Sequence, residues 1–143
     1  MFGFNRSVDI QSAVKKALSA EDSAPKRKHV RACIVYTWEH KSSRAFWETV
    51  KVQPIRNSDI SLFKTLILIH KVIQEGHPSA LSGGYKNIDW IGSLDTLSFQ
   101  DKKYRVLVGQ YVAYILRKLR FHQNHRGFNG TFEYEEYVSL STV

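Results

Sequence analysis

Apolar residues recur at helical spacing along nearly the whole chain, and this periodicity most constrains the fold. They return at the three- and four-residue intervals of amphipathic helices, and no segment alternates convincingly as a half-buried strand would. Pro54 and Gly76 interrupt the pattern, as residues that end helices do. The predicted helical segments are residues 7–20, 25–40, 42–53, 57–76, one or two short helices within 79–99, and 99–124.

Capping residues set the predicted starts of four of these helices. The proposed N-caps are Ser7, Ser23, Ser42 or Ser43, and Asn57 or Ser58, with Pro25 in the first turn of the second helix. We expect a flexible bend at Gly83-Gly84, and the acidic, aromatic tail 127–143 matches no element. Six or seven helices joined by short links favour an all-α right-handed superhelical stack or bundle.

Size and cysteine content narrow the class of protein. A chain of 143 residues, 43% of them hydrophobic, can bury one core, so residues 1–143 are predicted to form a single domain. The one cysteine, Cys33, lies in an apolar run and is predicted to be buried; it excludes an internal disulfide. No apolar stretch is long enough to span a bilayer and no signal peptide is visible, so a cytoplasmic location is expected.

The net charge of +8 is unevenly distributed. Residues 1–44 carry nine bases and four acids, and residues 100–126 carry seven bases and one acid, whereas residues 45–99 are balanced and the tail is acidic. Two basic blocks of this kind favour a polyanionic partner. Nucleic acid, an anionic membrane and an acidic protein all satisfy this pattern, and a merely soluble basic surface remains an alternative.

A group of lysines and a histidine gives the sharpest functional prediction. Nine residues separate Lys16, near the end of the first predicted helix, from Lys26, which opens the run Lys26-Arg27-Lys28-His29 at the start of the second. An antiparallel hairpin of these helices would bring Lys16 beside Lys26, Lys28 and His29. The first turn of a helix also presents unpaired N–H groups and positive partial charge. Such a site suits a ligand that carries several phosphates, although a solvated basic face or a nucleic-acid contact would show the same pattern.

The segment APKRKHVRACIVYTWEH, with Lys16 upstream, resembles the signature of ANTH domains, the lipid-binding domains of endocytic clathrin-assembly adaptors. The family's motif is a lysine, nine residues, a second lysine, one residue, and a basic–histidine pair. Lys16, Lys26, Lys28 and His29 match every position of it. The segments LFKTLILIHKVIQEGHPSAL and LRKLRFHQNHRGFNGTFEYEEY extend the likeness, which is greatest to the fungal relatives of the huntingtin-interacting proteins.

This resemblance implies an α-helical superhelix without catalytic activity or cofactor. It implies binding of phosphatidylinositol 4,5-bisphosphate at the inner face of the plasma membrane, in endocytic actin patches, and co-assembly with epsin ENTH domains. ANTH domains are about twice as long, so the chain is expected to be the N-terminal part of one. Clathrin and actin would then bind regions of the adaptor outside this chain.

Other residues receive weaker predictions. Lys15, Arg27 and Arg31 are candidates for contact with lipid or a partner domain, and Phe2 and Phe4 for membrane insertion. The second basic block is predicted to lie on the surface of the long helix, with membrane contact as an alternative. Its members are Lys102, Lys103, Arg105, Arg117, Lys118 and Arg120.

The remaining histidines and tryptophans receive structural interpretations. His70 is predicted to be a hydrogen-bonded core residue and His77 to brace a turn. His122 and His125 are spaced to face one ligand, but no acid or cysteine completes a metal set, so no metal is expected. Trp38, Trp47 and Trp90 are expected to be core residues or contacts to a partner. No nucleophile elbow, P-loop, helix-turn-helix or RNP-like signature is present, which makes an enzyme the least favoured class and leaves a nucleic-acid binder or a pure interaction scaffold as alternatives.

Overall fold

A computed structural model describes residues 9–21, 23–96 and 101–133. Within these ranges the chain is helical and contains no strand, which confirms the all-α prediction. The elements are α1 Ile10–Ala17, α2 Arg27–His40, α3 Arg44–Lys51, η2 Ile55–Asn57, α4 Asp59–Glu75, α5 Ser79–Lys86, α6 Ile88–Ser93, η3 Leu94–Thr96 and α7 Lys102–Asn124. Ser7, Phe2 and Phe4 lie outside the described residues.

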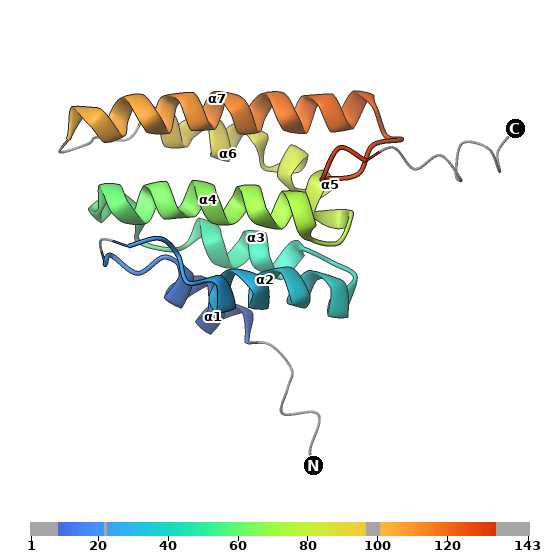
Figure 1. The fold of residues 1–143 in the computed structure, drawn as a ribbon, viewed down its shortest axis with the longest axis horizontal. Coiled ribbons are helices and arrows are strands. Elements are labelled where there is room, and N and C mark those ends of the chain that lie inside the picture. The colour runs from blue at the N-terminus through green and yellow to red at the C-terminus, as the bar shows by residue number, and fades with distance from the viewer. Residues whose placement is uncertain (1–8, 22, 97–100, 134–143) are drawn as a thin grey trace, which may run out of the picture.

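The helices stack in layers around α4. In Figure 1, α1, α2 and α3 lie on one side of α4, and α7 lies on the other. This central position explains why nine residues of α4 are buried, among them Leu66, Leu68 and Ile69. α2, α4 and α7 also begin at the same side of the stack, the left of Figure 1, so their N-terminal ends lie near one another.

The first two helices begin later than the sequence predicts. Asp9 is the N-cap of α1, because its carboxylate accepts hydrogen bonds from Gln11 N and Ser12 N at 3.1 and 3.3 Å. In α2 the N-cap is Lys26 rather than Ser23, and Pro25 precedes the helix. Lys26 has extended backbone angles while its carbonyl already accepts from Val30 N at 3.2 Å.

The middle helices follow the prediction more closely. Ser43 is the N-cap of α3, and Ser58 caps α4, whose Ser61 N donates to the Ser58 hydroxyl at 3.2 Å. α4 ends at Gly76, where His77 N donates to Thr37 Oγ1 at 3.0 Å. His77 Nδ1 also lies 2.9 Å from Ser79 Oγ, which confirms its role in the turn.

The predicted bend at Gly83-Gly84 is wrong, because both glycines lie inside α5. Helix packing accounts for their small size. A Cβ added at Gly83 would lie 2.6 Å from Trp47 Nε1, and one at Gly84 would lie 2.8 Å from Leu119 Cδ2. The glycines therefore allow α5 to approach α3 and α7 closely.

The interior holds the residues predicted for it, with some exceptions at its edge. Cys33 is fully buried, and burial raises the pKa of its thiol to about 12. His70 is only half-buried, and its Nδ1 lies 2.8 Å from the Tyr111 hydroxyl. Trp47 is buried and Trp90 packs against the core, whereas Trp38 is half exposed, although its indole N–H donates to Glu75 O at 2.9 Å.

Candidate functional site

Two neighbouring helix ends hold the four residues that the spacing singles out. Lys16 is the next-to-last residue of α1, Lys26 is the N-cap of α2, and Lys28 and His29 lie in the first turn of α2. α1 and α2 pack against each other. We call Lys16, Lys26, Lys28 and His29 the basic cluster.

The lysines of the basic cluster affect the pKa of His29. Partial desolvation lowers the pKa of His29, and the charges of Lys28, Lys16 and Lys26 lower it further, in that order. Charges act at this range only when they are close, because water screens them. All three lysines therefore disfavour protonation of the same imidazole. An anion that offsets these charges would raise the same pKa.

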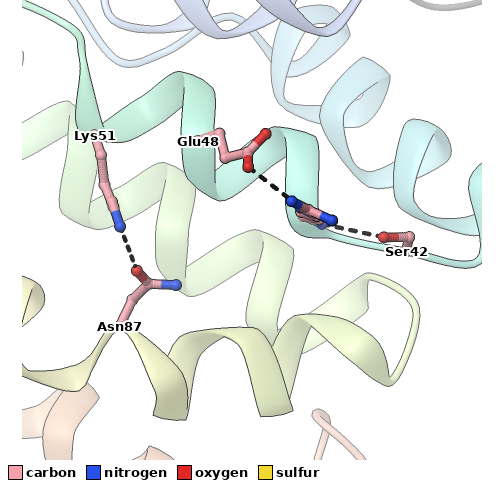
Figure 2. A network of polar contacts seen from close by, with 5 residues as sticks. Ser42, Glu48, Lys51 and Asn87 are labelled. Atoms are coloured by element: carbon pink, nitrogen blue, oxygen red, sulfur yellow. Dashed lines mark hydrogen bonds and ion pairs between the residues drawn. The ribbon is translucent and has the colours of Figure 1, made fainter.

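The charge of the basic cluster is available to a ligand. Its three lysines are exposed and His29 is half-buried. In the described part of the chain, the ion pairs lie elsewhere: Arg44 with Glu48 at 3.2 Å, and Lys71 with Glu75 at 3.9 Å. Figure 2 shows a further base in use, since Lys51 Nζ donates to Asn87 Oδ1 at 2.8 Å. The lysines of the basic cluster make no such contact among the described residues.

The backbone at the start of α2 adds to this potential. Lys26 supplies no side-chain acceptor to the first turn, and the first turn contains no acidic residue. Its N–H groups and the positive end of the helix dipole therefore act together with the ammonium groups. Lys15, Arg27 and Arg31 lie on the same two helices and are exposed, and their participation stays a prediction.

Two polar residues of α4 hold the end of α1 in place, and neither was predicted from the sequence. Ser61 Oγ donates to Leu18 O at 2.9 Å, and the buried Lys64 Nζ donates to Ser19 O at 2.7 Å. These carbonyls closely follow Lys16 in the chain, so the bonds position it beside α2. The sequence feature that could have indicated them is the spacing of Ser61 and Lys64, two polar residues three positions apart in a largely apolar helix.

The prediction that the second basic block lies on the surface is wrong for one of its members, Lys118. Its side chain is buried, with 3% of the residue exposed. Its Nζ donates to Gly130 O at 2.6 Å, lies 3.0 Å from His122 Nε2, and stands 3.7 Å from the centroid of the Phe132 ring. The other members of the block are exposed: Lys102, Lys103, Arg105, Arg117 and Arg120.

His122 and His125 have separate surroundings. His122 is buried against Lys118, whereas His125 stacks on Phe121 with the ring centroids 4.4 Å apart. Among the described residues, no three His, Cys, Asp or Glu side chains are grouped so as to hold a metal ion. Over the same residues, no helix combines the length and the apolar character needed to cross a membrane.

Comparison with known proteins identifies the family of this fold. The family model of the ANTH domain matches residues 9–143. The chain belongs to the ANTH domain family. Its helical stack is thus that of a domain class that binds lipids and acts in adaptors, not in catalysis.

Sequence relatives of this ANTH chain are endocytic proteins of yeasts. It is 57% identical to Protein SLA2 of Saccharomyces cerevisiae over 136 residues, which cover 94% of the chain and 14% of the relative. It is 46% identical to Endocytosis protein end4 of Schizosaccharomyces pombe over 137 residues, again 94% of the chain but 12% of the relative. The chain thus spans about one seventh or less of the length of these curated relatives.

Solved structures agree with the assignment. A chain in the structure of the epsin-2 ENTH domain in complex with phosphatidylinositol 4,5-bisphosphate has a TM-score of 0.86 and 50% identity, over 99% of this chain and 56% of that one. A chain in the cryo-EM structure of helical ANTH and ENTH tubules on membranes containing this lipid has a TM-score of 0.73 and 56% identity. That match covers 91% of this chain and 49% of the other.

Proposed function

We propose that the basic cluster binds the headgroup of phosphatidylinositol 4,5-bisphosphate and so recruits an endocytic adaptor to the membrane. The observation that carries this proposal is the position of the basic cluster: exposed lysines at the end of α1 and at the start of α2, two helices that pack against each other. Exposed ammonium groups at the end of α1 and the start of α2, which have no acceptor among the described residues, suit a ligand with several phosphates on one ring, which must be held from more than one side. The similar epsin-2 ENTH structure, which is a complex with this lipid, supports the choice of ligand.

The strength expected of one such site is modest. Each basic residue near an anionic leaflet contributes about 1 kcal/mol, so three lysines and a partly charged histidine give about 3–4 kcal/mol, in the millimolar range. Specific bonds to the headgroup would bring the affinity to about micromolar. Durable attachment then requires several linked sites.

Co-assembly supplies such multivalency. We propose that this ANTH domain assembles with epsin ENTH domains around shared lipid, and the similar structure of ANTH and ENTH tubules on lipid membranes supports this partner. Residues 1–143 would act as one unit, the N-terminal part of an ANTH domain, at endocytic actin patches on the inner face of the plasma membrane. Clathrin and actin would bind the longer adaptor through regions outside this chain.

Sedimentation with vesicles tests the proposal. Lys16→Ala, Lys28→Ala and His29→Ala are each compared with wild type on vesicles with and without phosphatidylinositol 4,5-bisphosphate, in the presence and absence of an ENTH domain. Lys41→Ala is the matched control, because Lys41 is an exposed base at the opposite end of α2. We expect each cluster variant to bind at least about fivefold more weakly, and the control to bind like wild type.

Three outcomes would contradict the proposal. Equal binding to vesicles that lack the bisphosphate lipid would exclude its headgroup as the ligand of the basic cluster. Salt-dependent DNA binding of similar strength would favour a nucleic-acid binder instead. Unchanged membrane recruitment of a Lys26→Glu, Lys28→Glu double variant would favour a pure protein-interaction scaffold.

A further inference from the structure

A groove joins the start of α2 to the start of α7. Its cavity of about 950 Å³ is lined by the link before α2, by one face of α4, and by the first turns of α7. Pro25, which directly precedes the cluster residue Lys26, lines one edge, and Lys103 lines another. The basic cluster and the first bases of the second basic block therefore border one end of the stack.

Hydrogen bonds fix the parts of this end relative to one another. Asp101 N, at the start of α7, donates to Asp59 Oδ2, at the start of α4, at 3.1 Å. On the other side, Lys64 of α4 donates to Ser19 O, in the link between α1 and α2. α4 is thus bonded both to the start of α7 and to the segment that carries the basic cluster. Both sides of the groove are therefore hydrogen-bonded to the same helix.

Lys102 and Lys103 are exposed, and within the described residues neither forms an ion pair. The nearby acids are engaged with the backbone. Asp101 Oδ1 accepts from Lys103 N at 2.8 Å, and Asp59 accepts from Asp101 N. Each carboxylate lies at a helix start, where its charge offsets the helix dipole. The ammonium groups of Lys102 and Lys103 therefore remain available to an external anion.

We propose that Lys102 and Lys103 form a second contact with anionic lipid. The contact rests on the proposed function, because it assigns a further surface to the same membrane-bound domain. While the basic cluster holds one phosphoinositide headgroup, Lys102 and Lys103 bind the phosphates of neighbouring lipids in the same leaflet. A flat membrane can meet both sides of the groove at once because they border the same end of the stack. The contact adds affinity without adding a second specific headgroup pocket.

Binding measurements with two ligands distinguish the contribution of Lys102 and Lys103 from that of the basic cluster. Binding is measured to vesicles that contain phosphatidylserine and phosphatidylinositol 4,5-bisphosphate, and to soluble inositol 1,4,5-trisphosphate. The variants are Lys102→Gln/Lys103→Gln and Lys26→Gln/Lys28→Gln. Lys41→Gln/Arg126→Gln is the matched control, since these exposed bases lie at the far ends of α2 and α7. Thermal unfolding of each variant checks that it folds.

The Lys102→Gln/Lys103→Gln variant should bind vesicles about tenfold more weakly than the control and bind the soluble trisphosphate like wild type. Vesicle binding equal to that of the control would overturn the second contact. So would an equal loss in all three variants, because the loss would then follow from net charge alone. Failure of the proposed function is distinguishable, since Lys26→Gln/Lys28→Gln would then leave the binding of both ligands unchanged.

Discussion

The molecule pairs lysine with histidine in two regions that differ in burial. The basic cluster combines three exposed lysines with the half-buried His29. At the other end of the stack, buried Lys118 lies 3.0 Å from buried His122. In both regions desolvation and lysine charge lower the pKa of the histidine. The same residue types therefore produce the same sign of shift at a surface and in an interior.

What differs is where the lysine charge is used. The buried ammonium group of Lys118 is bonded to Gly130 O and faces the ring of Phe132, so its charge stabilises the turn that follows α7. The ammonium groups of the basic cluster have no protein acceptor among the described residues, so an anionic ligand would relieve their mutual repulsion. The first pair stabilises the fold, and the second is suited to binding.

Removing the buried lysine should have the largest effect on stability. Lys118→Ala leaves a cavity and an unpaired carbonyl at Gly130, and we expect it to lower the free energy of unfolding by about 3 kcal/mol. Urea denaturation measures this loss. Headgroup binding at a temperature where the variant is folded should stay at the wild-type level. A loss below about 1 kcal/mol would show that the buried contact contributes little.

Reversing charge in the basic cluster should have the opposite profile. Lys26→Glu/Lys28→Glu is expected to weaken binding to vesicles that contain the bisphosphate lipid by at least about 100-fold. Its free energy of unfolding should not fall, because acidic residues at a helix N-terminus are favourable. Isothermal titration and urea denaturation of one preparation provide both values, and a parallel loss of stability and binding would break the distinction between the regions.

Gly130→Ala changes the residue whose carbonyl accepts the hydrogen bond from buried Lys118, and so tests the buried region alone. A Cβ at this position would collide with Ile73 O and lie 2.5 Å from Gln74 O, both of them rigid backbone atoms. We expect a loss of about 2 kcal/mol in the free energy of unfolding. Gly92→Ala is the comparison for adding a methyl group where there is room, since the nearest contact of its Cβ would be 3.8 Å away. Equal stability of the two variants would contradict the packing described at Gly130.

Acid should act on the two regions in opposite directions, with the smallest effect of the set. The folded-state pKa of His122 lies below its unfolded value of 6.5, so the unfolded chain binds more protons and stability falls as pH drops through this range. Burial lowers the pKa of Lys118 from 10.5 to about 8, so the free energy of unfolding should rise as pH increases from about 8 to about 10.5.

Headgroup binding should instead strengthen as pH falls from about 8 to about 6, because His29 takes up a proton. Urea denaturation and vesicle binding at both ends of the range check the signs, and a flat binding profile would exclude a role for the His29 charge.

The sequence was sufficient to predict the helices and the packing of α1 against α2, because a short link after an amphipathic helix makes a hairpin. The joint action of Lys16, Lys26, Lys28 and His29 on a ligand stays a prediction. It could not predict the burial of Lys118. A lysine and a histidine four residues apart are usual on a solvated helix face, and it is the turn through Gly130 that covers them. That turn lies in the tail that matched no helical or strand pattern.

Two other predictions, the bend at Gly83-Gly84 and the start of α2, were also wrong. Gly83 and Gly84 indicate a bend by local conformational preference, but contacts with Trp47 and Leu119 require small residues in a helix there. Ser23 and Pro25 are favourable at a helix start, yet α2 begins after Lys26. Contacts from distant segments override local preference at the glycines.

The titration of the His29 imidazole by NMR tests the central claim most directly, with and without soluble inositol 1,4,5-trisphosphate. Without ligand, the pKa of His29 should lie below 6.5, because desolvation and the charges of three lysines disfavour the added proton. With ligand it should rise, while the pKa of buried His122 stays unchanged. A His29 pKa that does not respond to saturating trisphosphate would contradict the assignment of the headgroup to the basic cluster.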